Sequence, residues 1–264
     1  MVEVFQESLA CLLLSQPDEK CAAAFELQAR FEKETLDVSK SDKVKSIVTP
    51  GRPEKPKLVS PREVARRNLA TEEGRIALIH AIAHIEFNAI NLALDAVYRF
   101  QDMPEEYYKD WMQVAFEEAQ HFTMLSKRLQ ELGCEYGDFD AHNGLWEMAL
   151  KTQHSVIARM ALVPRVLEAR GLDVTPGMIK RLQGHGDCAT VEILKIIFEQ
   201  EIGHVAIGSR WFNYACELEN VSPEETFQDL LKEFMAGELR GPFELEARRK
   251  AGFSSAELEV LQSI

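Results

Sequence analysis

The sequence lacks the features that mark membrane, secreted and disulfide-stabilised proteins. No apolar run approaches the ~20 residues that a helix needs to span a bilayer. The N-terminus holds Glu3 and Glu7 and no early Lys or Arg, which does not fit a secretory signal. Cysteine is scarce, because the 264 residues contain only five, an odd number without CxxC spacing. We therefore expect a soluble, cytoplasmic protein whose cysteines are ordinary thiols.

Strand-like alternation of useful length is also missing, whereas apolar residues recur at helical spacing. With 46% hydrophobic residues, the chain can bury a large core. We predict an all-α protein built around a four-helix bundle. Its predicted parts are an N-terminal helical segment (1–36), a basic, proline-containing linker (37–69), the bundle (70–219) and a C-terminal helical extension (220–264).

The charge of the chain is acidic but unevenly distributed. The formal net charge is −13, which argues against nonspecific binding to nucleic acid. Residues 37–67 nevertheless hold nine Lys or Arg and four acids, together with four prolines. An exposed basic arm of this kind could contact nucleic acid, although a solvated linker fits the composition better.

Two Glu-x-x-His tetrads are the motif in the sequence that best indicates a functional site. They run from Glu118 to His121 and from Glu201 to His204. Two such matches alone are weak evidence, because chance produces them in a chain rich in glutamate. Each tetrad, however, follows an isolated glutamate on an apolar stretch: Glu86 lies 32 residues before Glu118, and Glu168 lies 33 before Glu201. The recurrence predicts two similar helical hairpins.

Helix geometry explains the spacing within each tetrad. Residues three apart on an α-helix differ by roughly 60° in direction and about 4.5 Å in height, so a carboxylate and an imidazole can reach one metal ion. A bundle can hold two metal ions with one Glu from each of two helices and a Glu-x-x-His from each of the other two. The predicted metal ligands are Glu86, Glu118, His121, Glu168, Glu201 and His204.

The predicted ligands lie on apolar helix faces. The positions at helical spacing around Glu86, Glu118 and Glu201 are mostly aliphatic or aromatic. Four carboxylates buried together repel one another strongly, and two divalent cations would neutralise them. The competing interpretation places these acids and histidines on a solvated or hydrogen-bonded face.

Glu168 fits this pattern less well than the other glutamates. Arg165 lies three residues before it and Gly171 three residues after it. A surface Glu–Arg pair or a helix C-terminus is therefore an open alternative at this position.

The remaining histidines do not share the predicted ligand faces. His80 and His84 lie roughly 120° and 160° around their helix from Glu86, so we expect core or supporting roles for them. His154 is about 21 Å along the helix axis from Glu168, too far for the same metal ion. His142 and His185 fall in connections that contain Gly and Asp.

Helix start and stop signals place the ligands on the bundle. Glu86 and Glu118 each lie sixteen residues from Asp102, so an antiparallel turn there brings them to one height. Pro164 removes a backbone donor and should kink its helix, which could open room beside Glu168. The expected helices are Thr71–Phe100, with Thr71 as N-cap, then Pro104–Leu132, 144–170, 175–184 and Asp187–Glu219, followed by one that starts near Ser222 and another near Ser254.

The same motifs carry a resemblance to a known group of proteins. The arrangement of Glu86, Glu118-x-x-His121, Glu168 and Glu201-x-x-His204 resembles the ferritin-like superfamily. That superfamily includes rubrerythrins, manganese catalases, the ribonucleotide reductase small subunit and bacterial di-iron hydroxylases. A narrower resemblance, to a bacterial ferritin-like family of unknown function, is carried by residues 79–95 (IHAIAHIEFNAINLALD), 116–122 (FEEAQHF), 159–173 (RMALVPRVLEARGLD) and 199–212 (EQEIGHVAIGSRWF). The motif match covers about residues 70–218.

This resemblance implies a ferritin-like four-helix bundle with extra N- and C-terminal helices. It also implies a dimetal centre with Glu118 and Glu201 as bridging ligands and the other four as terminal ligands. Iron is the metal we expect, although manganese or a mixed centre stays open because Glu and His bind all of them.

Three classes of function follow from the predicted centre. The leading hypothesis is an oxidoreductase that activates O₂ to oxidise or hydroxylate an unidentified small molecule, with an electron-donor protein as partner. The alternatives are ferroxidase, peroxide-detoxifying or catalase-like chemistry, and a non-enzymatic bundle that metal stabilises. We expect no membrane or nucleic-acid partner, and the oligomeric state stays open.

Overall fold

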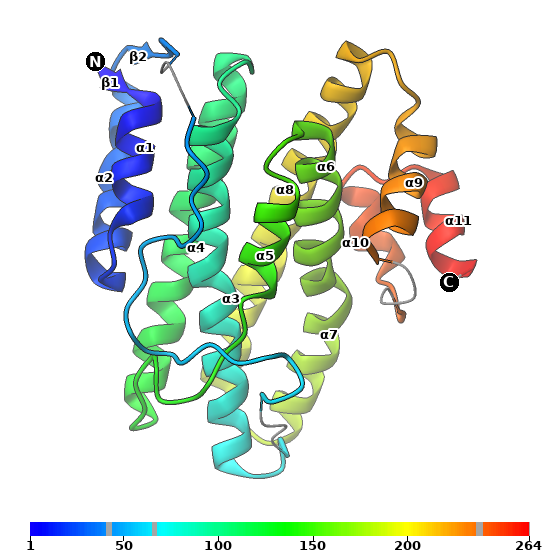
Figure 1. The fold of residues 1–264 in the computed structure, drawn as a ribbon. Coiled ribbons are helices and arrows are strands. Elements are labelled where there is room, and N and C mark those ends of the chain that lie inside the picture. The colour runs from blue at the N-terminus through cyan, green and yellow to red at the C-terminus, as the bar shows by residue number, and fades with distance from the viewer. Residues whose placement is uncertain (41–43, 65–67, 236–239, 264) are drawn as a thin grey trace. The chain divides into compact units, whose positions relative to one another are not determined.

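The protein is all-α, as the sequence predicts (Figure 1). The computed structural model describes residues 1–40, 44–64, 68–235 and 240–263. Strand pairing within these ranges is confined to two short parallel strands, β1 (Val2–Glu3) and β2 (Leu36–Asp37), and an isolated bridge between Leu58 and Ala141. All five cysteines are free thiols, and four of them are buried.

Two compact units divide the chain by their internal contacts. Unit 1 comprises residues 1–150 and 185–193, and unit 2 comprises 151–184 and 194–264. The long helix α8 (Cys188–Leu218) begins in unit 1 and continues in unit 2. The four parts predicted from the sequence describe a different division and stay a prediction.

Four helices form the body of unit 1. Helix α1 packs on α3, α2 packs on α4, and α3 and α4 pack along their length as a hairpin (Figure 1). A short helix, α5, follows them. The bounds are α1 Val4–Leu13, α2 Pro17–Lys33, α3 Glu72–Arg99, α4 Glu105–Glu131 and α5 Gly144–Lys151.

The start of α3 follows the predicted capping signal. The Thr71 hydroxyl oxygen accepts a hydrogen bond from the Gly74 amide at 3.1 Å, and Glu72 and Glu73 lie in the first turn, where carboxylates favour the helix dipole. By length and composition α3 could cross a membrane, but 72% of its apolar window is buried within the described structure. Such burial is typical of the core helix of a soluble protein.

Two tyrosines fix the α3–α4 hairpin. The hydroxyl of Tyr107 donates to the carbonyl of Ala96 at 3.3 Å, and the hydroxyl of Tyr108 donates to that of Phe100 at 3.2 Å. The two helices are therefore held antiparallel about the turn near Asp102, as predicted.

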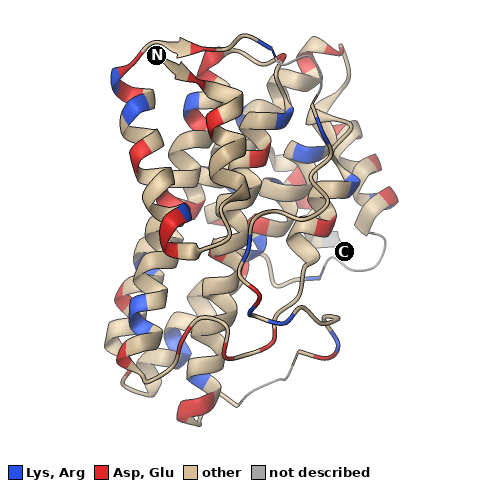
Figure 2. Cartoon of the chain, turned by 60° about the vertical axis from the view of Figure 1, so that its left-hand side comes forward, with Lys and Arg blue, Asp and Glu red and all other residues tan. Residues whose placement is uncertain are grey.

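The basic region is extended in its described parts but is tied to the helices of unit 1. The Trp146 indole donates to the carbonyls of Ile47 and Val48, and the Gly51 amide donates to the carbonyl of Leu12. Basic positions recur along this segment (Figure 2). Residues 41–43 and 65–67 of the predicted linker lie outside the described residues.

Lys20 of α2 is a buried cation that joins this region to the bundle. Its side chain is fully buried, and Nζ donates to the carbonyls of Leu12 at 2.9 Å and Gly51 at 2.7 Å, and to the side-chain oxygen of Asn91. Burial lowers the pKa of Lys20 to about 7. These three acceptors offset part of the cost of removing the ammonium group from water.

Unit 2 begins with a helical segment that changes its winding at Pro164. The α-helix α6 (Val156–Leu162) continues as a π-helix, η1 (Val163–Glu168), and then as α7 (Ala169–Gly184). Pro164 has no amide hydrogen, and the Ala169 amide donates to the Pro164 carbonyl, five residues back. The proline thus widens the helix, where the sequence predicts a kink.

The continuous helix predicted over 144–170 is wrong. Helix α5 ends at Lys151, and α6 starts after Ser155, whose hydroxyl accepts from the Ala158 amide at 3.2 Å. This N-cap is a start signal that the apolar periodicity on either side conceals. The short helix predicted at 175–184 is the second half of α7, which passes through Pro176 without ending.

Three further helices complete unit 2. Helix α9 starts at the predicted signal, because the Ser222 hydroxyl accepts from the Glu225 amide at 3.4 Å, and it packs against α6. The sequence also predicted α11 but missed α10. Their bounds are α9 Pro223–Met235, α10 Leu245–Lys250 and α11 Ser255–Ser263.

Candidate metal centre

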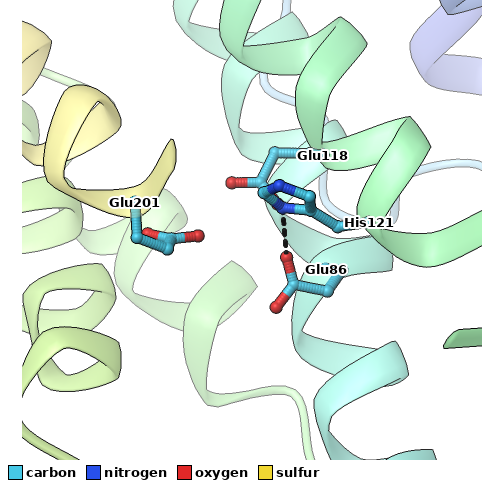
Figure 3. Close-up of side chains that lie close together, drawn as sticks. All are labelled: Glu86, Glu118, His121 and Glu201. Atoms are coloured by element: carbon cyan, nitrogen blue, oxygen red, sulfur yellow. Dashed lines mark hydrogen bonds and ion pairs between the residues drawn. The ribbon is translucent and has the colours of Figure 1, made fainter. Parts of the chain in front are cut away.

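The α3–α4 hairpin brings three of the six predicted ligands together. Nδ1 of His121 lies 3.0 Å from Oε2 of Glu86 and 3.3 Å from Oε2 of Glu118 (Figure 3). Their potential ligand atoms lie within 4.8 Å of one another. We call these three residues the hairpin cluster. Glu201, also drawn in Figure 3, lies on the part of α8 that belongs to unit 2 and is described with that unit.

The hairpin cluster is removed from solvent. Glu118 and His121 are fully buried, and Glu86 is 3% exposed. Burial raises the pKa of Glu86 well above its usual value, and the charge of Glu118 adds to the shift. Burial lowers the pKa of His121, but its hydrogen bonds to the carboxylates of Glu118 and Glu86 outweigh this effect and raise the pKa well above the usual value. Both shifts favour the protonated forms of Glu86 and His121.

Aromatic residues next in sequence to the hairpin cluster pack against one another. Phe87 and Phe122 follow Glu86 and His121 in sequence, and their ring centroids lie 5.4 Å apart. The ring of Tyr136 packs against both, with its centroid 5.7 Å from that of Phe87 and 5.0 Å from that of Phe122. The Tyr136 ring thereby joins Phe87 of α3 to Phe122 of α4, and the three rings form an aromatic wall.

His80 and His84 support this wall and are not part of the hairpin cluster, as predicted. Nδ1 of His84 lies 2.9 Å from the hydroxyl of Tyr136, and Nε2 lies 3.1 Å from the carbonyl of His142. The His80 ring stacks on Tyr136, and its Nε2 accepts a hydrogen bond from the Gly137 amide. Burial lowers the pKa of each of the two histidines to about 4, so both stay neutral at pH 7.

In unit 2, α8 places the second tetrad on its buried face. His204 is fully buried and Glu201 is 8% exposed. Nδ1 of His204 lies 3.6 Å from Oε1 of Glu201, the i, i+3 relationship that the sequence predicts. The two side chains therefore present one imidazole and one carboxylate from one helix face.

Glu168 is buried and ends the π-helix η1, which runs antiparallel to α8 (Figure 1). An added Cβ on Gly208 would lie 2.5 Å from the Pro164 ring, so the two helices approach closely there. Glu168 lies four residues after Pro164, and His204 lies four residues before Gly208. In antiparallel helices these offsets bring Glu168 and His204 to about the same height.

The alternatives for Glu168 do not hold in the structure. Arg165, its expected surface partner, is itself buried and pairs with Glu257 at 2.7 Å. The helix also continues from Glu168 into α7 without a break. Sequence analysis missed the Arg165–Glu257 pair, although Ser254-x-x-Glu257 is a capping-box signal that marks the start of α11.

Comparison with known proteins shows the family of the chain. Residues 13–259 match the model of a family described as "Protein of unknown function (DUF455)". The chain belongs to this family. The chain is also similar to an uncharacterized protein from Haemophilus influenzae (strain ATCC 51907 / DSM 11121 / KW20 / Rd). The two sequences are 41% identical over 275 residues, and the alignment covers 100% of this chain and 95% of the relative. No solved structure matches the chain.

Proposed function

We propose that this protein is a ferritin-like dimetal oxidoreductase that uses two metal ions, iron in the first place, to oxidise or hydroxylate a small molecule with O₂. The observation that carries the proposal is the buried hairpin cluster of Glu86, Glu118 and His121. Two carboxylates and an imidazole buried together are a costly arrangement in a core unless a cation is bound there.

The donor set fits a first-row transition metal. Carboxylate oxygen and imidazole nitrogen are ligands for iron and manganese, and none of the five cysteines belongs to the cluster. The carboxylates of Glu86 and Glu118 provide negative charge, and His121 provides a nitrogen donor once it is neutral. These three side chains would hold one metal ion and share the second.

The second tetrad completes the proposed centre. Glu201 and His204 of α8 repeat the Glu-x-x-His relationship of α4, and Glu168 comes to the height of His204. All six residues would hold the proposed pair of ions, with Glu118 and Glu201 as the two carboxylates that the resemblance implies are shared between them. The recurrence of the pattern in sequence and the burial of every member support this assignment.

A bound pair of reduced metal ions would supply the electrons with which O₂ is activated for attack on an organic substrate. The chain's own residues would orient the ions and exclude bulk water. Phe87, Phe122 and Tyr136, which pack against one another, would contribute to excluding water from the hairpin. His84 holds the Tyr136 hydroxyl and so fixes the wall.

Elemental analysis combined with O₂ uptake tests the proposal. Protein purified from its native host should contain about two metal ions per chain, and the reduced protein should consume O₂. Glu118→Ala should lose both metals and O₂ uptake, because a bridging carboxylate holds both ions. A Glu118→Ala chain that keeps two metals would refute the assignment.

The same assay separates the alternative functions. Repeated turnover with Fe(II) or H₂O₂ and no other substrate would favour ferroxidase or peroxide-detoxifying chemistry. A protein that binds two metals, loses thermal stability on chelation and consumes no O₂ would be a metal-stabilised bundle without an oxidase reaction.

A further inference from the structure

Arg165 lies in an unusual environment in the middle of η1. Its side chain is 1% exposed, and its guanidinium carbon lies 4.5–4.6 Å from the centres of three aromatic rings. Planar guanidinium groups bind aromatic faces well, and the interaction strengthens when water is excluded. The three rings belong to Phe212 of α8, Phe227 of α9 and Phe253, which precedes α11.

Two polar groups fix the orientation of this guanidinium. Nη2 donates to Oε1 of Glu257 at 2.7 Å, and Nε donates to the Ser209 hydroxyl at 3.1 Å. Glu257 also accepts from the Ser254 amide with its other oxygen, at 2.8 Å, as the acidic member of the α11 capping box. One carboxylate therefore joins the start of α11 to the π-helix.

The π-helix needs such support because its winding is not the default of the chain. Long π-helices are rare, and single turns of this kind concentrate at functional sites. Glu168 lies three residues beyond Arg165 on η1. Whatever fixes Arg165 therefore fixes the direction in which the Glu168 carboxylate leaves the helix.

We propose that Arg165 is a positioning residue that, through Glu257 and the rings of Phe212, Phe227 and Phe253, holds η1 in its π-helical register and so orients the Glu168 carboxylate. The inference rests on the proposed function, because it takes Glu168 as a metal ligand. It gives the C-terminal extension a role that a minimal four-helix bundle does not need.

A paired variant tests the inference without leaving a buried charge unpaired. In the full-length chain, Arg165→Met with Glu257→Gln removes both charges, and glutamine can still serve in the capping box. Gly208→Ala displaces η1 from the other side by pressing on Pro164, and Gly203→Ala on the same helix is the control, because a Cβ there meets no atom within 4 Å.

The first readout is backbone amide exchange of the metal-free protein. The paired variant and Gly208→Ala should each speed exchange in 163–172 by about tenfold, while exchange elsewhere in unit 2 stays close to the wild type. Gly203→Ala should exchange in 163–172 no faster than the wild type. Unchanged exchange in 163–172 in a paired variant with native melting temperature would overturn the inference.

The second readout is the affinity for Co²⁺ alone, followed by its visible absorption. The paired variant should bind the ion that Glu168 ligates about tenfold more weakly, as for other residues that orient ligands. Adding the pair to Glu168→Gln should weaken binding no further, because both changes act through one carboxylate. Full additivity would overturn the inference.

These results separate this inference from the proposed function. A wild-type chain that binds no Co²⁺ refutes the proposed function and, with it, the ligand role of Glu168. Two bound ions in the wild type with unaltered affinity in the paired variant refute only the role of Arg165.

Discussion

Nδ1 of His121 lies 3.0 Å from Oε2 of Glu86, across the two helices of one hairpin. The contact joins residues 35 positions apart, and both side chains are buried. It is a hydrogen bond between an imidazole and a carboxylate. The pKa values of His121 and Glu86 are both raised.

This contact predicts that metal binding releases protons. Both groups must give up protons to become ligands, so metal competes with protons and the affinity should fall as the pH falls. Calorimetric titration with Mn²⁺ in buffers of different ionisation enthalpy measures the number released. Glu86→Gln should release about one proton fewer per chain. An equal number in both proteins would contradict this role for Glu86.

The close approach of Gly208 to Pro164 predicts opposite effects for two similar changes on α8. Gly208→Ala places a methyl group 2.5 Å from the proline ring and should destabilise the protein by about 1–3 kcal/mol. Gly203→Ala adds the same group in open space and should stabilise it by roughly 0.5–1 kcal/mol, because alanine favours the helix. Denaturant unfolding of both variants measures the sign of the change in the free energy of unfolding. Equal changes in the two variants would contradict the close contact between Gly208 and Pro164.

His80 and His84 predict an acid-sensitive unit 1. Their pKa values are near 4 in the folded protein and near 6.5 when unfolded, so the unfolded chain takes up protons first as the pH falls. Their contribution to stability is complete above pH 6.5 and is lost between pH 6.5 and 4, by roughly 3 kcal/mol for each histidine at most.

His84→Gln tests this pH dependence. Glutamine cannot titrate, so the free energy of unfolding should fall less steeply between pH 6.5 and 4 than in the wild type, by about half of the histidine contribution. The comparison cancels the carboxylates that titrate in the same range. Parallel curves for the two proteins would contradict the lowered pKa of His84.

The hydrogen bonds of Lys20 are expected to hold the segment around Gly51 against the helices of unit 1. Lys20→Met leaves the carbonyls of Leu12 and Gly51 without their buried donor, and should cost about 1–3 kcal/mol of stability. Limited proteolysis should then cut near Gly51 more readily. Lys33→Met, on the exposed side of α2, is the matched control and should stay within about 0.5 kcal/mol of the wild type.

The sequence predicts the hairpin cluster well because local rules determine it. Thr71 caps α3, and equal distances from the turn near Asp102 bring Glu86 and Glu118 to one height. An antiparallel hairpin converts such distances directly into proximity. The acids on an apolar face could therefore be recognised before any tertiary contact was known.

The π-helix and its support could not be predicted in the same way. Pro164 signals a local irregularity, but whether a helix kinks or widens depends on its neighbours, here Gly208 and Arg165. The partner of Arg165 lies 92 residues away, and its three aromatic rings come from separate segments. No periodicity connects such positions. Lys20 is missed for the same reason, because its acceptors lie on three different segments.

Anomalous X-ray diffraction from crystals loaded with Fe²⁺ or Mn²⁺ tests the central claim most directly. The proposal predicts two peaks in each chain, both contacted by Glu118 and Glu201, with Glu86, His121, Glu168 and His204 as the terminal ligands. A crystal with no peak at Glu86, Glu118 and His121, in which His121 still bridges the two carboxylates at saturating metal, would contradict it.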